Sequence, residues 1–469
     1  MMHGIVPPNL YTTENSIITI YQKEIMRLTN VSVNNLFGIF DHNIPLNGDS
    51  GITIIIGENG LGKTVILESI HYFFTKNFSF FRKLEFQYFK FSFSNGEIWE
   101  ISRRVEGNSI GLYVVRWFEY KQDRSKPYKF YEASILDEND DAPPYSSKHR
   151  IDSYRDLIEE ARLQSDHRLH DFMLYEYMMT KNRGRIYERE VTGKKIPTWF
   201  NDVINKVEVK IIETQRIMTA KERGGDAYVR TVQKFSNELV EKISKLSKES
   251  AEISVALDST YPNRLMQKLR QREIDSYDEL NQALSKLDER RKLLSSTGLI
   301  ENQAGSDLLQ INNSDTSLFN PLKLYIDDSN KKLSPYDEMA EKISLFKWIL
   351  NRRFKHKNIE IHRSKGFVFR SSVPQGATAV LPEIPPHKLS SGEQNELVMF
   401  YDLIFNSKKG DTMLIDEPEL SLHISWQNKF ISDLKYVTSM NNVSIVIATH
   451  SPDIIADNWD LKVELLGVE

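Results

Sequence analysis

Residues 57–64 constrain this chain more than any other stretch, because their sequence, GENGLGKT, fits the pattern GxxxxGK[ST]. The preceding run, GITIII at 51–56, is rich in β-branched residues and predicts a strand that is buried on both faces. After the loop, apolar residues recur at helical spacing from Val65 to Phe73, with neither Gly nor Pro among them. A strand, this loop and a helix in succession predict a phosphate-binding P-loop, and therefore an α/β fold.

The residue types of the loop suit the binding of phosphates. Glycines let the backbone N–H groups curve around an anion with no Cβ in the way. The N-terminus of the following helix adds partial positive charge, Lys63 can reach the β- and γ-phosphates, and the Thr64 hydroxyl can ligate Mg²⁺. The predicted phosphate-binding residues are Gly57, Glu58, Asn59, Gly60, Leu61, Gly62, Lys63 and Thr64.

Composition excludes several classes of chemistry. The 469 residues include no cysteine, which removes disulfides, thiol catalysis, iron–sulfur clusters and Cys-ligated zinc, and which fits a reducing cytosol. The net charge of −4 leaves no basic field over the whole chain for nucleic acid. Residues 1–21 lack the order of a signal peptide, and no run of 18 apolar residues occurs, so we expect a cytoplasmic protein with no membrane partner.

Pattern and composition divide the chain into six segments. We expect a polar lead-in at 1–24, an N-terminal lobe with the P-loop at 25–133, a mixed helical and strand insertion at 134–225, a coiled-coil hairpin at 226–297, a linker and return to the sheet at 298–384, and a C-terminal lobe at 385–469. Strands are predicted at 25–33, 38–46, 51–56, 86–93, 98–103, 111–120, 207–212, 359–362 and 366–370. Helices are predicted at 155–164, 166–182 and 337–354. Asn95-Gly96 predicts a hairpin turn between two of the strands.

The hairpin is predicted from heptad spacing. Val232, Leu239, Leu246 and Ile253 lie seven residues apart, and the spacing resumes from Tyr277 to Leu294 after a break at 258–263 that contains Pro262. Two helices joined by a short turn form an antiparallel pair. The sequence leaves open whether this pair protrudes or folds back on the body. Residues 298–332 are rich in Asn, Ser and Asp and predict a loop.

The densest basic cluster has two interpretations. It consists of Lys181, Arg183, Arg185, Arg189, Lys194 and Lys195. These side chains can contact phosphates of nucleic acid. A solvated charged loop is the interpretation that the net negative charge favours.

Three further motifs follow in the C-terminal lobe. Ser390 or Ser391 can cap a helix, and Glu393 completes a capping box. An apolar strand at 413–415 ends in Asp416 and Glu417, and another at 443–448 is followed by Thr449 and His450. Ligands of open α/β sheets bind at the carboxyl ends of the strands, so we expect these residues to converge on Lys63.

The succession of the loop, LSSGE at 389–393, LIDEP at 414–418 and a strand ending near His450 resembles the ABC-type ATPases, in the branch that contains SMC proteins, Rad-type DNA-break-repair ATPases and OLD-family proteins. The resemblance covers about 25–120 and 385–469. It implies an ABC-type P-loop ATPase fold of two lobes, with a mixed or parallel sheet and an antiparallel layer. It also implies ATP and Mg²⁺ as ligands.

This resemblance assigns roles by matching position. Lys63 and Thr64 would hold the phosphates and Mg²⁺, and Asp416 would support the metal. Glu417 would orient or deprotonate the attacking water, and His450 would sense the γ-phosphate. The signature motif, which would face the γ-phosphate of a second subunit, corresponds to Ser390, Ser391, Gly392 and Glu393. Homodimers or higher oligomers with composite ATP sites are thereby implied. Residues 419–423 match the dimer-contacting D-loop, and Gln87 is the Q-loop candidate for a metal ligand.

A closer resemblance is to bacterial anti-phage defence ATPases, namely that of PARIS (AriA) and, less closely, that of Septu (PtuA). It is based on IETQR at 212–216, LSSGEQ, IDEPELSLH followed by Trp426-Gln427, and ATHSP at 448–452. It implies an ATPase subunit that oligomerises, answers a phage-derived trigger, and holds or licenses a separate nuclease or toxin effector. We find no HNH-like cluster and expect no C-terminal Toprim domain, so a nuclease would be a partner chain.

Two other functions stay open. One is an SMC-like or Rad-type ATPase that acts directly on DNA in repair or maintenance, using residues 181–195 or the hairpin to grip the duplex. The other is an ATP-gated scaffold with negligible turnover. The presence of Glu417 argues against the scaffold, because a scaffold needs no water-orienting carboxylate.

Overall fold

The computed structural model describes residues 26–106, 109–118, 131–135, 204–212, 218–220, 228–270, 277–301, 318–372, 382–420 and 422–467. Several predictions lie outside these residues. They are the lead-in at 1–24, the helices at 155–164 and 166–182, and the basic cluster at 181–195.

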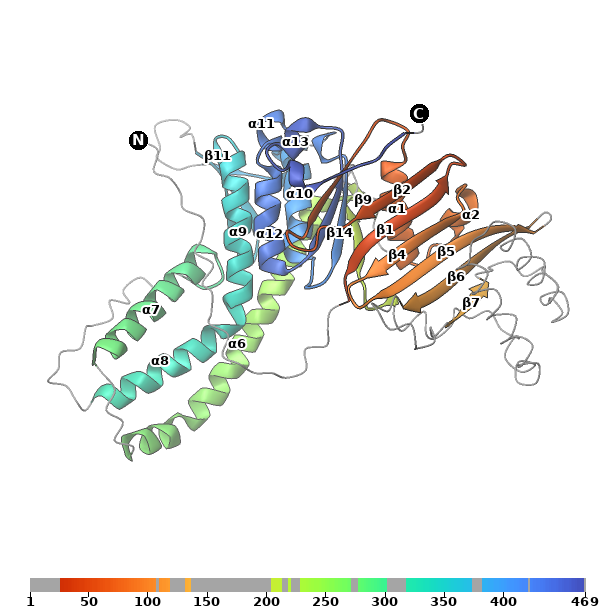
Figure 1. The fold of residues 1–469 in the computed structure, drawn as a ribbon. Coiled ribbons are helices and arrows are strands. Elements are labelled where there is room, and N and C mark those ends of the chain that lie inside the picture. The colour runs from red at the N-terminus through yellow and green to blue at the C-terminus, as the bar shows by residue number, and fades with distance from the viewer. Residues whose placement is uncertain are drawn as a thin grey trace, which may run out of the picture.

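A five-stranded parallel sheet forms the centre of the molecule (Figure 1). Its strand order is β16-β3-β15-β14-β8, with β3 at Ile52–Ile56, β8 at Val209–Ile212, β14 at Thr412–Asp416, β15 at Ser444–Ala448 and β16 at Lys462–Glu464. Strands β3, β14 and β15 are almost entirely buried because helices cover both faces. Helix α1 (Lys63–Phe74) packs on one face, and α10 (Ser391–Phe405) and α12 (Phe430–Asn441) pack on the other.

A six-stranded antiparallel sheet forms the second layer, with the order β2-β1-β4-β5-β6-β7. The strands are β1 (Leu28–Leu36), β2 (Phe40–Pro45), β4 (Tyr88–Phe93), β5 (Glu97–Glu106), β6 (Ser109–Phe118) and β7 (Tyr131–Ile135). Alternate residues of β4 are buried, and Phe91 stacks on Phe73 of α1 with ring centroids 4.3 Å apart. Helix α2 (Ser79–Lys83) adds Phe81 to the same core. The turn predicted at Asn95-Gly96 joins β4 to β5, and Gly96 adopts a φ of 81°.

The helical region differs from the predicted hairpin. Helix α6 runs unbroken over Thr231–Arg270, through Pro262, so the predicted break at 258–263 is wrong. Proline removes one backbone donor from a helix. Side chains near the proline bond to backbone carbonyls of the preceding turns, since Thr260 Oγ1 donates to the Ala256 carbonyl at 3.1 Å and Arg264 Nη2 donates to that of Leu257 at 2.9 Å. Arg264 also pairs with Asp328 of the neighbouring helix, which holds this part of α6 in place.

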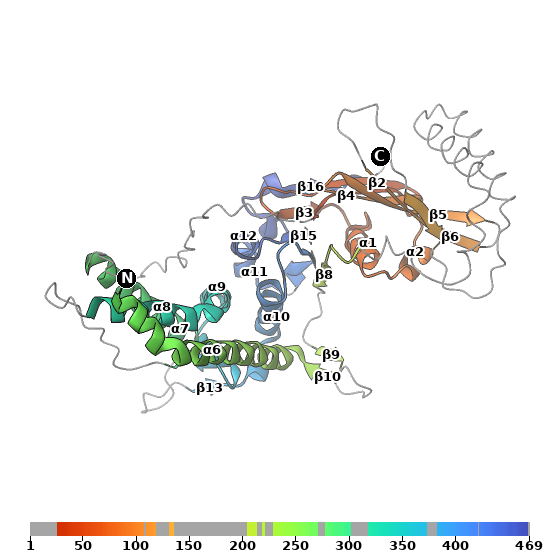
Figure 2. The same cartoon turned by 90° about the horizontal axis from the view of Figure 1, so that it is seen from below.

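The loop predicted at 298–332 is also wrong in part, because α8 occupies Phe319–Leu333. Several of its polar residues are exposed, but Asp328 and Ser329 are buried. Phe319 and Ile326 pack against Leu284 and Leu287 of α7 (Tyr277–Ser296). Helix α8 lies between α6 and α7, so the unit has three helices where the sequence predicted two (Figure 1). The distal half of this three-helix unit extends away from the parallel sheet and the antiparallel sheet, as the view from below also shows (Figure 2).

Helix α9 (Asp337–Arg353) leads from this helical unit back to the body, as predicted for 337–354. It is followed by a small antiparallel sheet of β11 (Lys357–His362), β12 (Gly366–Ser371) and β13 (Glu383–Ile384). The remaining short elements are β9 (Met218–Ala220), β10 (Tyr228–Arg230), α11 (Ile424–Gln427), α13 (Pro452–Ile455), and the 3₁₀ turns η3 (Ser334–Tyr336), η4 (Pro386–Lys388), η5 (Pro418–Leu420) and η6 (Trp459–Leu461). Nowhere in the described ranges is a helix both long and apolar enough to cross a bilayer.

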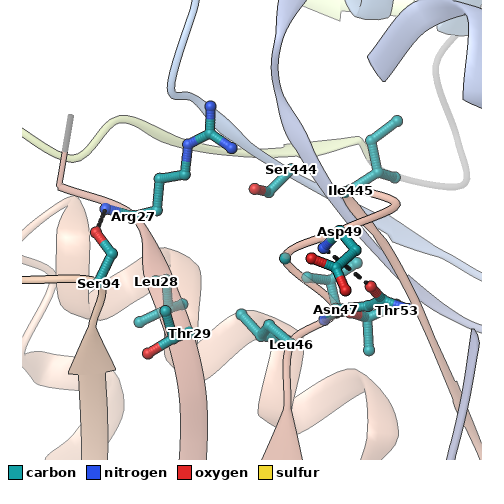
Figure 3. A pocket seen from close by; sticks show the side chains of 13 residues that line it. Arg27, Leu28, Thr29, Leu46, Asn47, Asp49, Thr53, Ser94, Ser444 and Ile445 are labelled. Carbon is teal, nitrogen blue, oxygen red and sulfur yellow. Dashed lines mark hydrogen bonds between the residues drawn. The ribbon is translucent and has the colours of Figure 1, made fainter. Parts of the chain in front are cut away.

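A pocket of about 300 Å³ lies between the two sheets, at the amino ends of β3 and β15 (Figure 3). Arg27, Asn47, Asp49 and Ser444 are among its lining residues. Because the motif residues follow the carboxyl ends of these strands, the pocket lies at the opposite edge of the parallel sheet from them.

Candidate nucleotide-binding site

The carboxyl ends of three parallel strands bring the motifs together. Ile55 of β3 is in register with Ala448 of β15, which is in register with Asp416 of β14. The residues that follow each strand therefore emerge side by side. Lys63 Nζ lies 3.3 Å from His450 Nδ1, which confirms that the loop and the His450 turn meet.

The loop is already curved around the Lys63 ammonium. Lys63 Nζ donates to the carbonyls of Gly57 at 2.9 Å and Glu58 at 3.0 Å. Gly60 and Gly62 adopt φ angles of 88° and 89°, which an L side chain rarely adopts. Burial lowers the pKa of Lys63, while the carboxylates of Glu417, Asp416 and Glu419 act in the opposite direction. A buried ammonium in a glycine-rich turn at a helix N-terminus fits an anionic phosphate ligand.

Thr64 and Asp416 form the other side of the site. The Thr64 hydroxyl donates to Asp416 Oδ1 at 3.2 Å. Burial raises the pKa of Asp416, the hydrogen bond from Thr64 lowers it, and the neighbouring carboxylates of Glu417 and Glu419 raise it further. A hydroxyl and a carboxylate are hard oxygen donors, so the pair fits a Mg²⁺ ion that also takes phosphate and water ligands. A divalent cation would favour the ionised form of Asp416.

Glu417 stands at a sharp turn directly after β14. Its φ of 41° is in the left-handed region, and its N–H donates to the Ala448 carbonyl at 2.9 Å. Its Oε1 lies 3.7 Å from His450 Nε2. Strained non-glycine residues occur at functional sites when the surrounding structure holds them in place. Here the conformation directs the carboxylate toward His450 and away from the buried strand.

The His450 turn is held by residues that sequence spacing did not assign. The His450 N–H donates to Glu419 Oε1 at 2.9 Å, and Ser451 Oγ donates to Gln427 Oε1 at 2.8 Å. The sequence places Glu419 in the D-loop match and Gln427 just beyond it. The only signal for Gln427 was the Trp426-Gln427 pair in the closer resemblance, which gave it no role.

The signature motif forms the predicted cap. Ser390 is the N-cap of α10, its Oγ accepts from the Glu393 N–H at 3.3 Å, and Glu393 Oε2 accepts from the Ser390 N–H at 2.8 Å. Ser390 is therefore the capping serine, and Ser391 is the exposed first residue of the helix. Lys357 Nζ pairs with Glu393 at 2.7 Å. No contact within the described part of the chain joins this motif to Lys63 or His450, so its predicted role opposite a second subunit stays a prediction.

Gln87 directly precedes β4 of the antiparallel sheet. Its N–H donates to the Asn34 carbonyl, its carbonyl accepts from the Arg103 N–H, and its side chain is exposed. In the described ranges no contact joins that side chain to Thr64 or Asp416, so the structure does not bring this predicted metal ligand to the site. Strand β8 ends beside β14, at Ile212, and the sequence continues there as Glu213-Thr214-Gln215, outside the described residues.

Solved structures similar to this chain include SMC head domains. The Pyrococcus furiosus Smc head domain with an extended coiled coil, bound to the C-terminal domain of ScpA, is 12% identical, with 92% of this chain and 91% of that chain covered and a TM-score of 0.30. An SmcHead bound to the C-winged helix domain of ScpA is 10% identical, with 94% of each chain covered and a TM-score of 0.35. The SMC head domain from Thermotoga maritima is 9% identical, with 94% of this chain and 99% of that chain covered and a TM-score of 0.31.

No curated protein sequence matches the chain. One protein-family model does, and it is described as an AAA ATPase domain. The match extends over residues 26–455 and so includes the loop, both carboxylates and His450. The α/β P-loop fold predicted from the sequence is confirmed, and the chain belongs to the AAA ATPase domain family.

Proposed function

We propose that this protein binds and hydrolyses ATP with Mg²⁺, as the oligomeric ATPase subunit of a bacterial anti-phage defence system that holds or licenses a separate nuclease or toxin effector. The observation that carries the ATPase part is the meeting of Lys63, Thr64, Asp416, Glu417 and His450 at the ends of β3, β14 and β15. The defence part is supported by the sequence resemblance alone.

The arrangement divides the work of phosphoryl transfer. Lys63 and the loop N–H groups bind the phosphates, and Thr64 and Asp416 would hold Mg²⁺, which neutralises phosphate charge when bound. Glu417 accepts a proton from the attacking water, whose oxygen forms the new bond to the γ-phosphorus as the bond to the bridging oxygen breaks. His450 lies 3.7 Å from Glu417 and 3.3 Å from Lys63, a position from which it can respond to the γ-phosphate.

Exposed apolar side chains around this site support self-association across it. Leu420 and Ile424, in the segment after Glu417, are 68% and 72% exposed, and Leu466, next to the residue that packs on Gly57, is 72% exposed. Exposed apolar side chains that gather on one face are typical of a protein interface, and we propose that Leu420, Ile424 and Leu466 form such a face. In a dimer formed through this face, Ser390–Gly392 of one copy would complete the site of the other.

The test of this assembly is mass measurement with and without ATP. We expect Leu420→Asp combined with Ile424→Asp to abolish the ATP-dependent increase in mass, because both substitutions place charge in the interface. Val255→Asp, at a position on α6 that is 70% exposed, is the matched control and should leave the increase intact. If the double variant still associates with ATP, the proposed face is wrong.

The test of the defence role is co-purification from cells that carry the neighbouring genes, followed by mass measurement. We expect a second polypeptide with nuclease or toxin activity to co-purify with the wild-type protein. We expect its activity to depend on phage infection and on Lys63. If the ATPase protects cells against phage with no second polypeptide, the effector part of the proposal is wrong.

Direct action on DNA is the second candidate, and the basic cluster at 181–195 is the feature that favours it. It predicts salt-sensitive binding of duplex DNA by the purified protein alone, weakened by charge reversal at Arg183 and Arg185. Absence of binding at low salt would remove this candidate.

A further inference from the structure

We infer that Gln427 is a positioning residue, which ties the turn carrying His450 to the exposed segment that follows Glu417. It would set the rate of hydrolysis, with little effect on the affinity for ATP. This inference depends on the ATPase activity proposed above. It adds a structural route by which contact with a second copy changes the position of His450, the residue assigned to the γ-phosphate.

Gln427 is buried, with 6% of its surface exposed, and its side-chain amide joins two stretches of chain. Its Nε2 donates to the Leu422 carbonyl at 3.3 Å and lies 3.5 Å from that of Glu419. Its Oε1 accepts from Ser451 Oγ at 2.8 Å. A buried amide that satisfies partners on two segments fixes their relative position, because losing either bond leaves a buried polar group unpaired.

The segment 418–427 supplies two of the attachments of the His450 turn. Thr449 N–H donates to the Ile55 carbonyl of β3 at 3.1 Å, so that end is attached to the sheet. The His450 N–H donates to Glu419 and the Ser451 hydroxyl donates to Gln427. Two consecutive residues of the turn, His450 and Ser451, therefore depend on the segment 418–427 for their position.

The same segment carries two exposed apolar side chains, those of Leu420 and Ile424. Leu420 belongs to η5 and Ile424 begins α11, the short helix that ends in Gln427. A second copy that packs on Leu420 and Ile424 would therefore displace the residues that hold the His450 turn, Glu419 and Gln427. His450 is already within 3.7 Å of Glu417, so a small displacement changes the alignment of both groups with a bound triphosphate.

The test separates turnover from binding with a conservative series. We expect Ser451→Ala and Gln427→Leu each to lower kcat about 10-fold to 100-fold, the range that follows from small misplacement of catalytic groups. The Kd for ATP, measured by equilibrium binding, should change less than about twofold, because neither side chain is assigned to phosphate binding. Ser451→Thr keeps the hydroxyl and should recover most of the loss. Ser432→Ala, at an exposed position of α12, is the matched control.

The combined variant gives the decisive comparison. Ser451→Ala and Gln427→Leu remove the same hydrogen bond, so together they should lower kcat no further than Gln427→Leu alone. If the losses of kcat in the two single variants add in the combined variant, or if Ser451→Ala leaves kcat unchanged, the inference is wrong. The proposed function still stands in that case, provided that the wild-type protein hydrolyses ATP. An equal loss of kcat and of ATP affinity would also overturn it. If the wild-type protein hydrolyses ATP no faster than Lys63→Ala does, both the proposed function and this inference are wrong.

Discussion

The Lys63 ammonium lies 3.3 Å from Nδ1 of His450, although the two residues are 387 positions apart in the chain. The parallel pairing of β3 with β15 brings them together, since Ile55 and Ala448 are in register, and the loop that leads to Lys63 and the turn that carries His450 follow these two strands. One contact thus joins the N-terminal P-loop to the C-terminal lobe. The site exists only when both ends of the chain have folded together.

Lys63→Ala should reduce ATP affinity at least about 100-fold. A charged hydrogen bond contributes about 1.5–3 kcal/mol, and the variant also removes the positive charge that faces the phosphates. Equilibrium titration with ATP and Mg²⁺ measures this loss. Lys83→Ala, at an exposed position of α2, is the control. Retention of wild-type affinity by Lys63→Ala would contradict the assignment of the loop.

Glu417→Gln should bind ATP normally, hydrolyse it about 100-fold to 10,000-fold more slowly, and accumulate as a closed dimer, because the amide cannot accept the proton of the attacking water. Single-turnover hydrolysis and light scattering with ATP measure the two effects. Glu383→Gln, an exposed carboxylate on β13, should behave as the wild type. Hydrolysis at the wild-type rate by Glu417→Gln would show that another group activates the water.

Gly62→Ala should destabilise the protein more than Gly60→Ala. Both glycines have φ near 90°, so both substitutions strain the backbone by about 1–3 kcal/mol. A Cβ at Gly62 would also lie 2.7 Å from Leu36 Cδ2, whereas a Cβ at Gly60 would meet nothing within 4 Å. Urea unfolding of the two variants gives the difference in the free energy of unfolding. An equal cost for both would mean that Leu36 moves aside freely.

The Glu393 carboxylate should make stability depend on pH in the acid range. Burial raises the pKa of Glu393, but hydrogen bonds from Lys357 and Ser390 lower it more, so the pKa in the folded protein lies below the ordinary 4.5. The unfolded chain then binds more protons, and stability falls as the pH drops from above 4.5 through the folded pKa. Urea unfolding between pH 6 and pH 3 should show a shallower decline for Glu393→Gln than for wild type. Glu464→Gln, with an exposed carboxylate, is the control, and the same slope in all three proteins would contradict this role for Glu393.

Local patterns were enough to predict much of the fold. The β-branched run before the loop, the alternation in β4, and the Asn95-Gly96 turn depend on residues that are neighbours in sequence, and all three form as predicted. The capping box at Ser390 and Glu393 is equally local. Prediction from helix propensity was wrong where contacts between residues distant in sequence override that propensity. Helix α6 continues through Pro262, and just beyond the proline Arg264 pairs with Asp328 on another helix, a contact between residues 64 positions apart.

The sequence by itself determined the chemistry that the site contains, because the loop, the two carboxylates at 416–417 and the histidine at 450 each lie within a short motif that dictates its own backbone. Only the tertiary structure decided how these groups face one another. The register of the parallel sheet sets the approach of Lys63 to His450, and the buried amide of Gln427 sets which segment holds Ser451. Contacts of this kind depend on the packing of elements hundreds of residues apart, and sequence spacing does not encode that packing.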